Sequence, residues 1–125
     1  MNNGLQSCPF CHSGGILFEN DLAYVVRDDN PVNPGHLLII PKCHVADFFL
    51  TTEAEKIALL SLLNEAKHYL DGKHAPAGYN IGINVGEAAG QTIFHVHLHL
   101  IPRYHGDTDN PREGVRGVIP SRQSY

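Results

Sequence analysis

The protein is a chain of 125 residues with a formal net charge of -4 at pH 7, of which 42% are hydrophobic and 18% charged. This is the composition of an ordinary globular protein, and the negative charge argues against broad binding to nucleic acid or to anionic membranes. A chain of this length forms one domain that buries roughly two thirds of its unfolded surface, so we expect a single domain over residues 1–125. Nine histidines are the compositional anomaly, and histidine suits proton transfer, nucleophilic attack and metal binding.

The sequence also bounds the compartment. No apolar run approaches the 18 or more residues of a membrane span, and residues 1–7 lack the basic and apolar regions of a signal peptide. We therefore expect a cytoplasmic protein with no membrane partner. The cysteines Cys8, Cys11 and Cys43 are odd in number, which argues against a disulfide framework and favours thiolates or metal ligands.

Residues 8–11 form a C-x-x-C motif with a proline inside it. Thioredoxin-like redox proteins carry such a motif after a strand and at the start of a helix. Here only seven mostly polar residues precede it, and Gly14 and Gly15 follow too soon for a helix. Half of a zinc site is the favoured interpretation, with a redox motif or two unrelated buried cysteines as the alternatives.

The first half of the sheet is predicted from short apolar runs. Residues 16–19 and 22–27 predict a hairpin, and residues 36–41 are a continuous apolar run ending at a proline, which predicts a buried strand with His36 at its start. The loop at residues 28–35 consists almost entirely of turn formers. A loop of this kind on a rigid sheet is a natural place for a ligand contact, although a solvated turn explains it equally well.

One helix is predicted over about residues 52–71. Thr52 and Glu55 form a capping box, and apolar residues then recur at helical spacing until Gly72. Ile57 and Leu60 widen the apolar stripe beyond what one face of a sheet requires. This indicates either contact with another subunit or a wider contact with the core.

Two more strands follow the helix. Residues 79–85 alternate and predict a strand, and residues 86–90 predict a hairpin loop. Residues 94–103 predict a strand in which His95, His97 and His99 share one face, about 6.6 Å apart at each step. The element order predicts an α+β fold, a five-stranded antiparallel sheet with one main helix on one face, followed by an irregular tail at residues 104–125.

These motifs resemble the histidine triad (HIT) family. Residues 95–99 fit its signature H-x-H-x-H with apolar x, and residues 90–92 resemble the loop that leads into the triad. Residues 33–42, with His44 after them, resemble the second motif of the family. With the C-x-x-C motif the resemblance covers a core at residues 8–103, and it implies a homodimer with a continuous sheet, in which the helix and the strand at residues 79–85 form the interface.

The resemblance implies a nucleotidyl hydrolase or transferase that cleaves at the α-phosphate of a nucleotide conjugate through a covalent nucleotidyl-histidine. The residues make this chemistry reasonable, because a neutral imidazole is a nucleophile at pH 7 when one nitrogen is free and the other donates to a fixed acceptor. The middle histidine, His97, is the expected nucleophile. The resemblance implies a catalytic set of His97, His99, His36 and Gln91. It also implies a nucleotide-binding set of Asp28, Asn84, Gln91, Thr92, His97, His99 and Phe10.

A structural zinc is expected, and no organic cofactor. The resemblance, together with the C-x-x-C motif, implies the ligands Cys8, Cys11, His44 and His95, which suit a closed tetrahedral site. Alternatively, the three histidines of the last strand hold a catalytic metal, but this leaves Gln91, Thr92 and His36 without a role.

Three alternatives concern the substrate. Residues 87–92 and 101–103 resemble the dinucleoside polyphosphate hydrolases of the family, and the resemblance therefore implies that substrate over a nucleoside phosphoramidate. A nucleotide-binding module without catalysis is the third possibility. Arg103, Arg112 and Arg116 are positioned either to reach distal phosphates or simply to be solvated.

Overall fold

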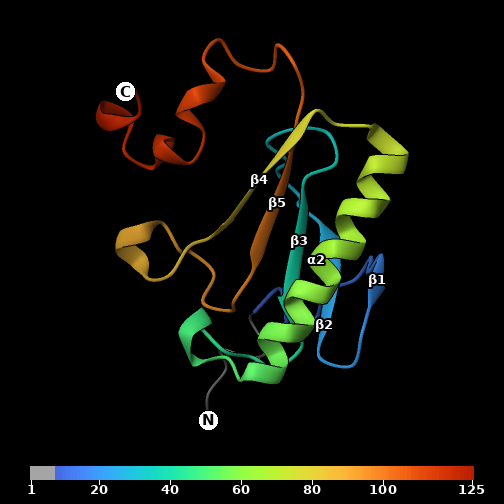
Figure 1. Ribbon diagram of the computed structural model, residues 1–125. Helices are drawn as coiled ribbons and strands as arrows, with labels where there is room; N and C mark the ends of the chain where they lie inside the picture. The colour runs from blue at the N-terminus through green and yellow to red at the C-terminus, as the bar shows by residue number, and fades with distance from the viewer. Residues whose placement is uncertain (1–7) are drawn as a thin grey trace.

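The computed structural model describes residues 8–125, and it consists of a five-stranded antiparallel sheet with one long helix across one face (Figure 1). The strands lie in the order β1-β2-β3-β5-β4. Their bounds are β1 (Phe18–Glu19), β2 (Ala23–Arg27), β3 (Leu37–Pro41), β4 (Gly78–Ile83) and β5 (Leu98–Arg103). The predicted α+β fold is confirmed.

The helix α2 (Glu53–His74) begins at the predicted capping box, where the side chains of Thr52 and Glu55 each accept the other residue's backbone N–H. It continues three residues beyond the prediction, because Gly72 lies inside the helix and the left-handed residue that ends it is Ala75, at φ 47°. Its buried side lies on the sheet and comprises Leu59, Leu62, Ala66 and Leu70.

The two faces of the sheet have different surroundings. On the helix face, alternate strand residues such as Ile39, Leu98 and Leu100 join the core under α2. On the opposite face, Leu38 pairs in register with Val26 on one side and with His99 on the other. The alternation along β5 therefore buries leucines against the helix and presents His99 on the open face.

The last strand is shorter than predicted. β5 begins at Leu98 and pairs antiparallel with β4, so the two strands form a hairpin as predicted, but its loop covers residues 84–97, including the 3-10 turn η2 (Glu87–Ala89), and is longer than the predicted residues 86–90. The physical reason is a different backbone partner, because the N–H of Val96 donates to the carbonyl of Val45, at 2.8 Å, and not to β4. His95 and His97 therefore lie in an extended connection, and among the triad His99 alone belongs to the paired strand.

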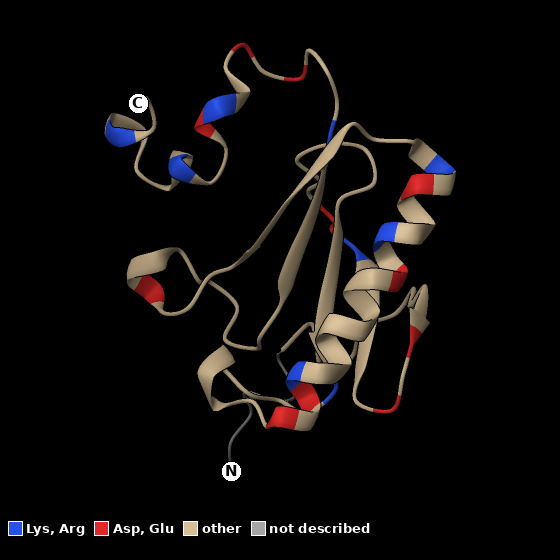
Figure 2. Ribbon diagram, viewed as in Figure 1, with Lys and Arg blue, Asp and Glu red and all other residues tan. Residues whose placement is uncertain are grey.

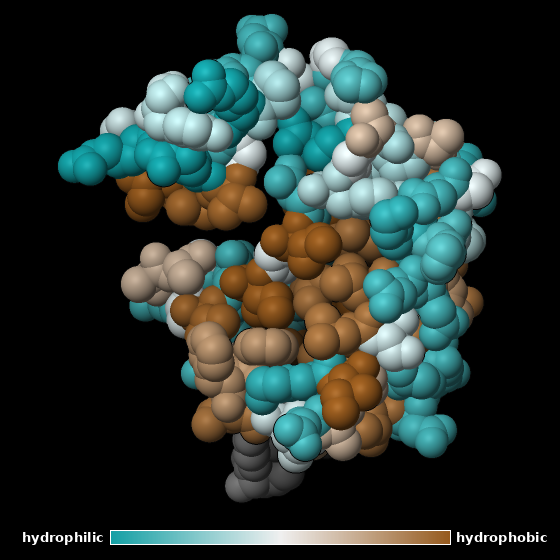
Figure 3. All heavy atoms as spheres, viewed as in Figure 1, coloured by the Kyte–Doolittle hydropathy of each residue, from teal (hydrophilic) through white to brown (hydrophobic). Residues whose placement is uncertain are grey.

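The tail was predicted to be irregular, but it forms the 3-10 turns η3 (Pro111–Val118) and η4 (Pro120–Arg122); a further turn, η1 (Phe48–Leu50), precedes α2. An apolar cleft of about 620 Å³ separates η3 from β4 and β5, with Val115 and Val118 on one side and Ile81 on the other (Figure 3). Arginines lie on the tail (Figure 2). Within residues 8–125 no helix is both long enough and apolar enough to cross a membrane.

Candidate active site

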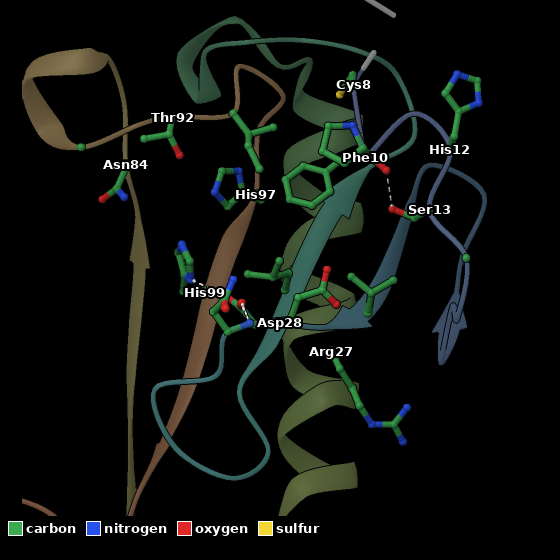
Figure 4. A pocket seen from close by; sticks show the side chains of 18 residues that line it. Cys8, Phe10, His12, Ser13, Arg27, Asp28, Asn84, Thr92, His97 and His99 are labelled. Carbon is green, nitrogen blue, oxygen red and sulfur yellow. Dashed lines mark hydrogen bonds and ion pairs between the residues drawn. The ribbon is translucent and has the colours of Figure 1, made fainter. Parts of the chain in front are cut away.

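A cavity of about 640 Å³ opens on the sheet face opposite α2. Its walls come from the C-x-x-C segment, the loop after β2, β3, the connection after β4, and β5. Six of the residues predicted for the site line it, namely Phe10, Asp28, Asn84, Thr92, His97 and His99 (Figure 4). The cavity therefore brings together residues that lie as far apart as positions 10 and 99 in the sequence.

His97 is held in the form a nucleophile needs. Its Nδ1 lies 2.9 Å from the carbonyl oxygen of His95, and because a carbonyl only accepts, Nδ1 carries the proton. Nε2 therefore keeps its lone pair, and within residues 8–125 this nitrogen makes no hydrogen bond. The ring packs against Phe10, with centroids 5.0 Å apart, on the cavity wall (Figure 4).

His36, His99 and Asp28 form a second arrangement, which we call the Asp–His chain. The backbone N–H of Val32 donates to Nδ1 of His36 at 3.0 Å, so the proton of this ring is on Nε2. That Nε2 lies 3.0 Å from Nδ1 of His99 and 3.4 Å from a carboxylate oxygen of Asp28. His99 accepts at Nδ1 and carries its own proton on Nε2, available to a ligand.

The surroundings keep the two rings of the chain neutral. Burial lowers the pKa of His99 to about 4, helped by the neighbouring His97 and His36 and opposed by Asp28. Burial also lowers the pKa of His36, again opposed by Asp28. Near pH 7 His99 is therefore a neutral hydrogen-bond donor, which suits contact with a phosphate oxygen.

The predicted metal ligands also come together, in what we call the Cys–His cluster: Cys8, Cys11, His44 and His95. Each offers one ligand atom, and all four atoms lie within 4.8 Å of one another. The cluster lies where the C-x-x-C turn meets the segment after β3 and the segment before β5.

The donor set fits zinc. Nε2 of His95 lies 2.7 Å from the carbonyl oxygen of Pro41 and carries the proton, so Nδ1 presents a lone pair to the sulfurs of Cys8 and Cys11 at 3.4 and 3.6 Å. Nδ1 of His44 lies 3.1 Å from Sγ of Cys11. Tetrahedral zinc with its usual bond lengths places sulfur and nitrogen ligands about 3.5 Å apart.

The Asp–His chain does not pass the same test, although its three ligand atoms also lie within 4.8 Å of one another. A metal on Nε2 of His36 would displace the proton that the N–H of Val32 fixes there, because Nδ1 already accepts that N–H. This group is therefore a chain of hydrogen bonds and not a metal site.

Two predicted site residues lie elsewhere. Gln91 is buried, and its amide bonds three backbone groups: the N–H of Gly86 and the carbonyls of Ala46 and Ile93. The structure therefore gives Gln91 the position of a loop anchor outside the cavity lining. Arg103 binds Asp107 and Asn80 and lines the cleft beside η3, outside the lining of this cavity.

The two other arginines named for distal phosphates lie in the tail. Arg112 and Arg116 each lie over the ring of Tyr125 in the tail. Leu38 and Ile93 line the cavity but carried no sequence signal distinct from ordinary core residues.

A histidine-rich cavity on the open face of this sheet defines a recognisable class of protein. Residues 13–106 match the model of the HIT domain family, and the chain belongs to that family. It is 32% identical over 97 residues to an AP-4-A phosphorylase of Mycobacterium tuberculosis and 36% identical over 100 residues to an adenylylsulfatase of Arabidopsis thaliana. These matches cover 77% and 80% of this chain, which spans about half the length of each relative (50% and 51%).

A crystal structure of a zinc-bound histidine triad family protein from Mycobacterium smegmatis has the same fold. The TM-score is 0.75 and the identity 32%, with 85% of this chain and 81% of that chain covered.

Proposed function

We propose that the protein is a nucleotidyl hydrolase or transferase in which His97 attacks the α-phosphate of a nucleotide conjugate. The observation that carries the proposal is the bond from Nδ1 of His97 to the carbonyl of His95, which leaves the Nε2 lone pair free at the cavity wall. Such a ring is a nucleophile at pH 7 without a separate base.

The groups around His97 support each step. In the first step Nε2 forms a bond to the α-phosphorus while the bridging bond of the phosphorus breaks and the leaving group departs with the electron pair. The ring then carries positive charge, and the carbonyl of His95 stabilises it through the Nδ1 proton. In the second step water attacks the phosphorus and releases one proton to solvent, the phosphorus–nitrogen bond breaks with its electron pair returning to Nε2, and the neutral ring is restored with its proton still on Nδ1.

The remaining predicted residues fit supporting roles. His99 donates from Nε2 to a non-bridging phosphate oxygen, and His36 holds the ring of His99 in that orientation. Asp28 lies beside them in the cavity, where a carboxylate suits the hydroxyls of a ribose. Phe10 provides an apolar wall for the base, and Asn84 and Thr92 provide polar contacts.

The leaving group is proposed to be a nucleotide, so that the substrate is a dinucleoside polyphosphate. Support comes from the name of one relative, an AP-4-A phosphorylase, while the other, an adenylylsulfatase, shares the adenylyl group with a different leaving group. Comparing kcat/KM for diadenosine polyphosphates with that for an adenosine phosphoramidate tests this choice. A large preference for the phosphoramidate would assign the chain to the alternative.

Turnover and trapping test the proposal itself. Wild-type protein mixed with radiolabelled diadenosine polyphosphate and quenched rapidly in alkali, where phosphohistidine survives, is expected to retain label on His97. The variant His97→Ala is expected to retain none and to lose at least about a thousandfold in kcat, the scale for removing a nucleophile. Activity retained by His97→Ala would exclude the covalent mechanism, whereas binding without any turnover by wild type would indicate a binding module.

Zinc in the Cys–His cluster is proposed to be structural. All four ligands come from protein, so a tetrahedral ion leaves no open position for substrate. When bound, the ion ties the C-x-x-C turn to the sheet.

A homodimer with a continuous sheet is also proposed. β4 is an edge strand, and Ile57 and Leu60 on α2 are 63% and 56% exposed. The free backbone groups of an edge strand suit pairing with a second copy, and the exposed apolar side chains of α2 suit burial in the same contact. Sedimentation at micromolar concentration tests it, and a monomer would remove the dimer without affecting the fold.

A further inference from the structure

The position of Phe10 depends on a turn that few backbone bonds hold. Phe10 lies between Cys8 and Cys11, where the turn has one internal backbone bond, from the N–H of Cys11 to the carbonyl of Cys8 at 3.2 Å. The ring nevertheless packs against His97 and against the apolar cluster on the open face of the sheet. The proposed zinc would hold the two cysteine side chains at the ends of the turn, so the backbone of the two residues between them needs a contact of its own.

Two hydroxyl groups contact that backbone. The hydroxyl of Tyr24 donates to the carbonyl of Phe10, and the hydroxyl of Ser13 donates to the carbonyl of Pro9 at 3.1 Å. The two hydroxyl oxygens are 3.0 Å apart. Both residues between the cysteines are therefore tied to the same pair of hydroxyls, as Figure 4 shows for Ser13.

Tyr24 connects this turn to a rigid element. It lies in β2, where it pairs in register with Ile40 and is only 4% exposed. Val26, two residues along the same strand and on the same face, lines the cavity beside Phe10. The strand that forms one part of the cavity wall thus also holds the turn that forms the next part.

We propose that Tyr24 is a positioning residue whose hydroxyl fixes the turn between Cys8 and Cys11, so that Phe10 closes the nucleotide pocket against His97. The inference rests on the proposed function and names a residue that acts through Phe10 and touches no reacting atom. His97 is oriented separately, by the carbonyl of His95. Loss of the Tyr24 hydroxyl therefore weakens nucleotide binding and leaves the chemical step intact.

The test is Tyr24→Phe, which keeps the ring in its cluster and removes the hydroxyl alone. We expect the Kd for AMP and the KM for a diadenosine polyphosphate to rise about five- to tenfold, the scale of one hydrogen bond, with kcat changed less than about twofold. Zinc content, measured by elemental analysis, is expected to equal that of wild type. Tyr79→Phe is the matched control, because its hydroxyl bonds Asp71 far from the cavity, and it is expected to change neither constant.

A double-mutant cycle tests whether Tyr24 acts on nucleotide binding through Phe10. In a Phe10→Ala background, Tyr24→Phe is expected to add less than about twofold to the Kd for AMP, because the group it positions is gone. Ser13→Ala, which removes the second hydroxyl at a half-buried position, is expected to act in the same direction but more weakly. It also keeps the inference testable if Tyr24→Phe fails to fold.

Several results would overturn the inference. These are an unchanged Kd and KM in Tyr24→Phe, an equal loss in kcat, loss of zinc, or full additivity with Phe10→Ala. Failure of the proposed function is distinguishable, because wild type would then not cleave the conjugate, whereas the Kd for AMP still tests the role of Tyr24.

Discussion

Two groups of histidines share the open face of the sheet, and the backbone gives them opposite chemistry. In the Cys–His cluster a carbonyl accepts a hydrogen bond from Nε2–H of His95. The lone pair on Nδ1 of the same ring therefore points to two thiols. In the Asp–His chain a backbone N–H donates to the lone pair on Nδ1 of His36. The proton on Nε2 of the same ring therefore points to His99. A carbonyl neighbour prepares a histidine to bind a metal, and an amide neighbour prepares it to donate.

His97 lies between the two groups and follows the first rule. Its Nδ1–H donates to the carbonyl of His95, just as Nε2–H of His95 donates to the carbonyl of Pro41. The free lone pair of His95 faces sulfur, whereas that of His97 faces the cavity. The same arrangement, a ring N–H on a carbonyl, therefore suits the proposed structural ion in one ring and the proposed nucleophile in the next.

Removing both thiols is expected to have the largest effect. Cys8→Ser with Cys11→Ser should reduce zinc from about one ion per chain to less than about a tenth, and should lower the free energy of unfolding by several kcal/mol, because metal binding adds to folding free energy. Elemental analysis and urea unfolding measure the two. Asp28→Asn is the control from the Asp–His chain and should retain the full zinc content. Loss of zinc in this variant, with zinc retained by the double cysteine variant, would assign the metal site to the Asp–His chain.

The next effect concerns His36. His36→Asn is expected to lower kcat/KM about ten- to a hundredfold, since the short amide cannot reach His99, with zinc content unchanged. His36→Gln, whose amide N–H reaches the position of Nε2, should recover most of the activity. If His36→Asn lost zinc while Cys8→Ser with Cys11→Ser kept it, the assignment of the two groups would be inverted.

Acid should weaken the fold through His99. As pH falls through about 6.5, the unfolded chain protonates this histidine, whereas the folded ring resists until its pKa of about 4, so stability is lost between these values. The ring is only 23% exposed, so solvent screens the effect little. Of the free energy of unfolding that wild type loses between pH 7.5 and pH 5, about 2 kcal/mol should come from His99 and be absent in His99→Gln. Urea unfolding at the two pH values measures it. His68→Gln, at an exposed position on α2, should leave the loss unchanged; an equal change in both variants would contradict the role of burial.

The smallest effect is expected at Cys43, next to a proposed metal ligand. Its thiol is exposed and lies outside the Cys–His cluster. Cys43→Ser should therefore leave zinc content unchanged and alter the free energy of unfolding by less than about 0.5 kcal/mol. Loss of zinc in this variant would require a different ligand set.

The sequence predicted the sheet and the helix because period and capping are local signals. The alternation at Leu98 and Leu100 and the capping box at Thr52 both appear in the structure as expected. The length of the last connection was not predictable in the same way, since it depends on the bond between Val96 and Val45, which are 51 positions apart. Only the folded chain brings those backbones together.

The candidate site shows the same division. The C-x-x-C motif indicated half of the Cys–His cluster, and the resemblance to the HIT family supplied His44 and His95, which spacing alone could not identify. Gln91 was expected in the pocket because residues 90–92 resemble the loop that leads into the triad, but its amide bonds the backbone of that loop, where three groups surround it. Tyr24 gave no signal, because within a strand pattern it reads as an ordinary core residue.

Strand β3 connects the two groups of histidines directly. His36 immediately precedes it, and Pro41, whose carbonyl holds His95, ends it. At about 3.3 Å per residue, these five residues set the distance between the Asp–His chain and the Cys–His cluster. Substitutions within β3 change its packing only, whereas insertion of one residue would turn every later side chain to the other face and alter the spacing. Variation in length within β3 should therefore be tolerated far less than variation in composition.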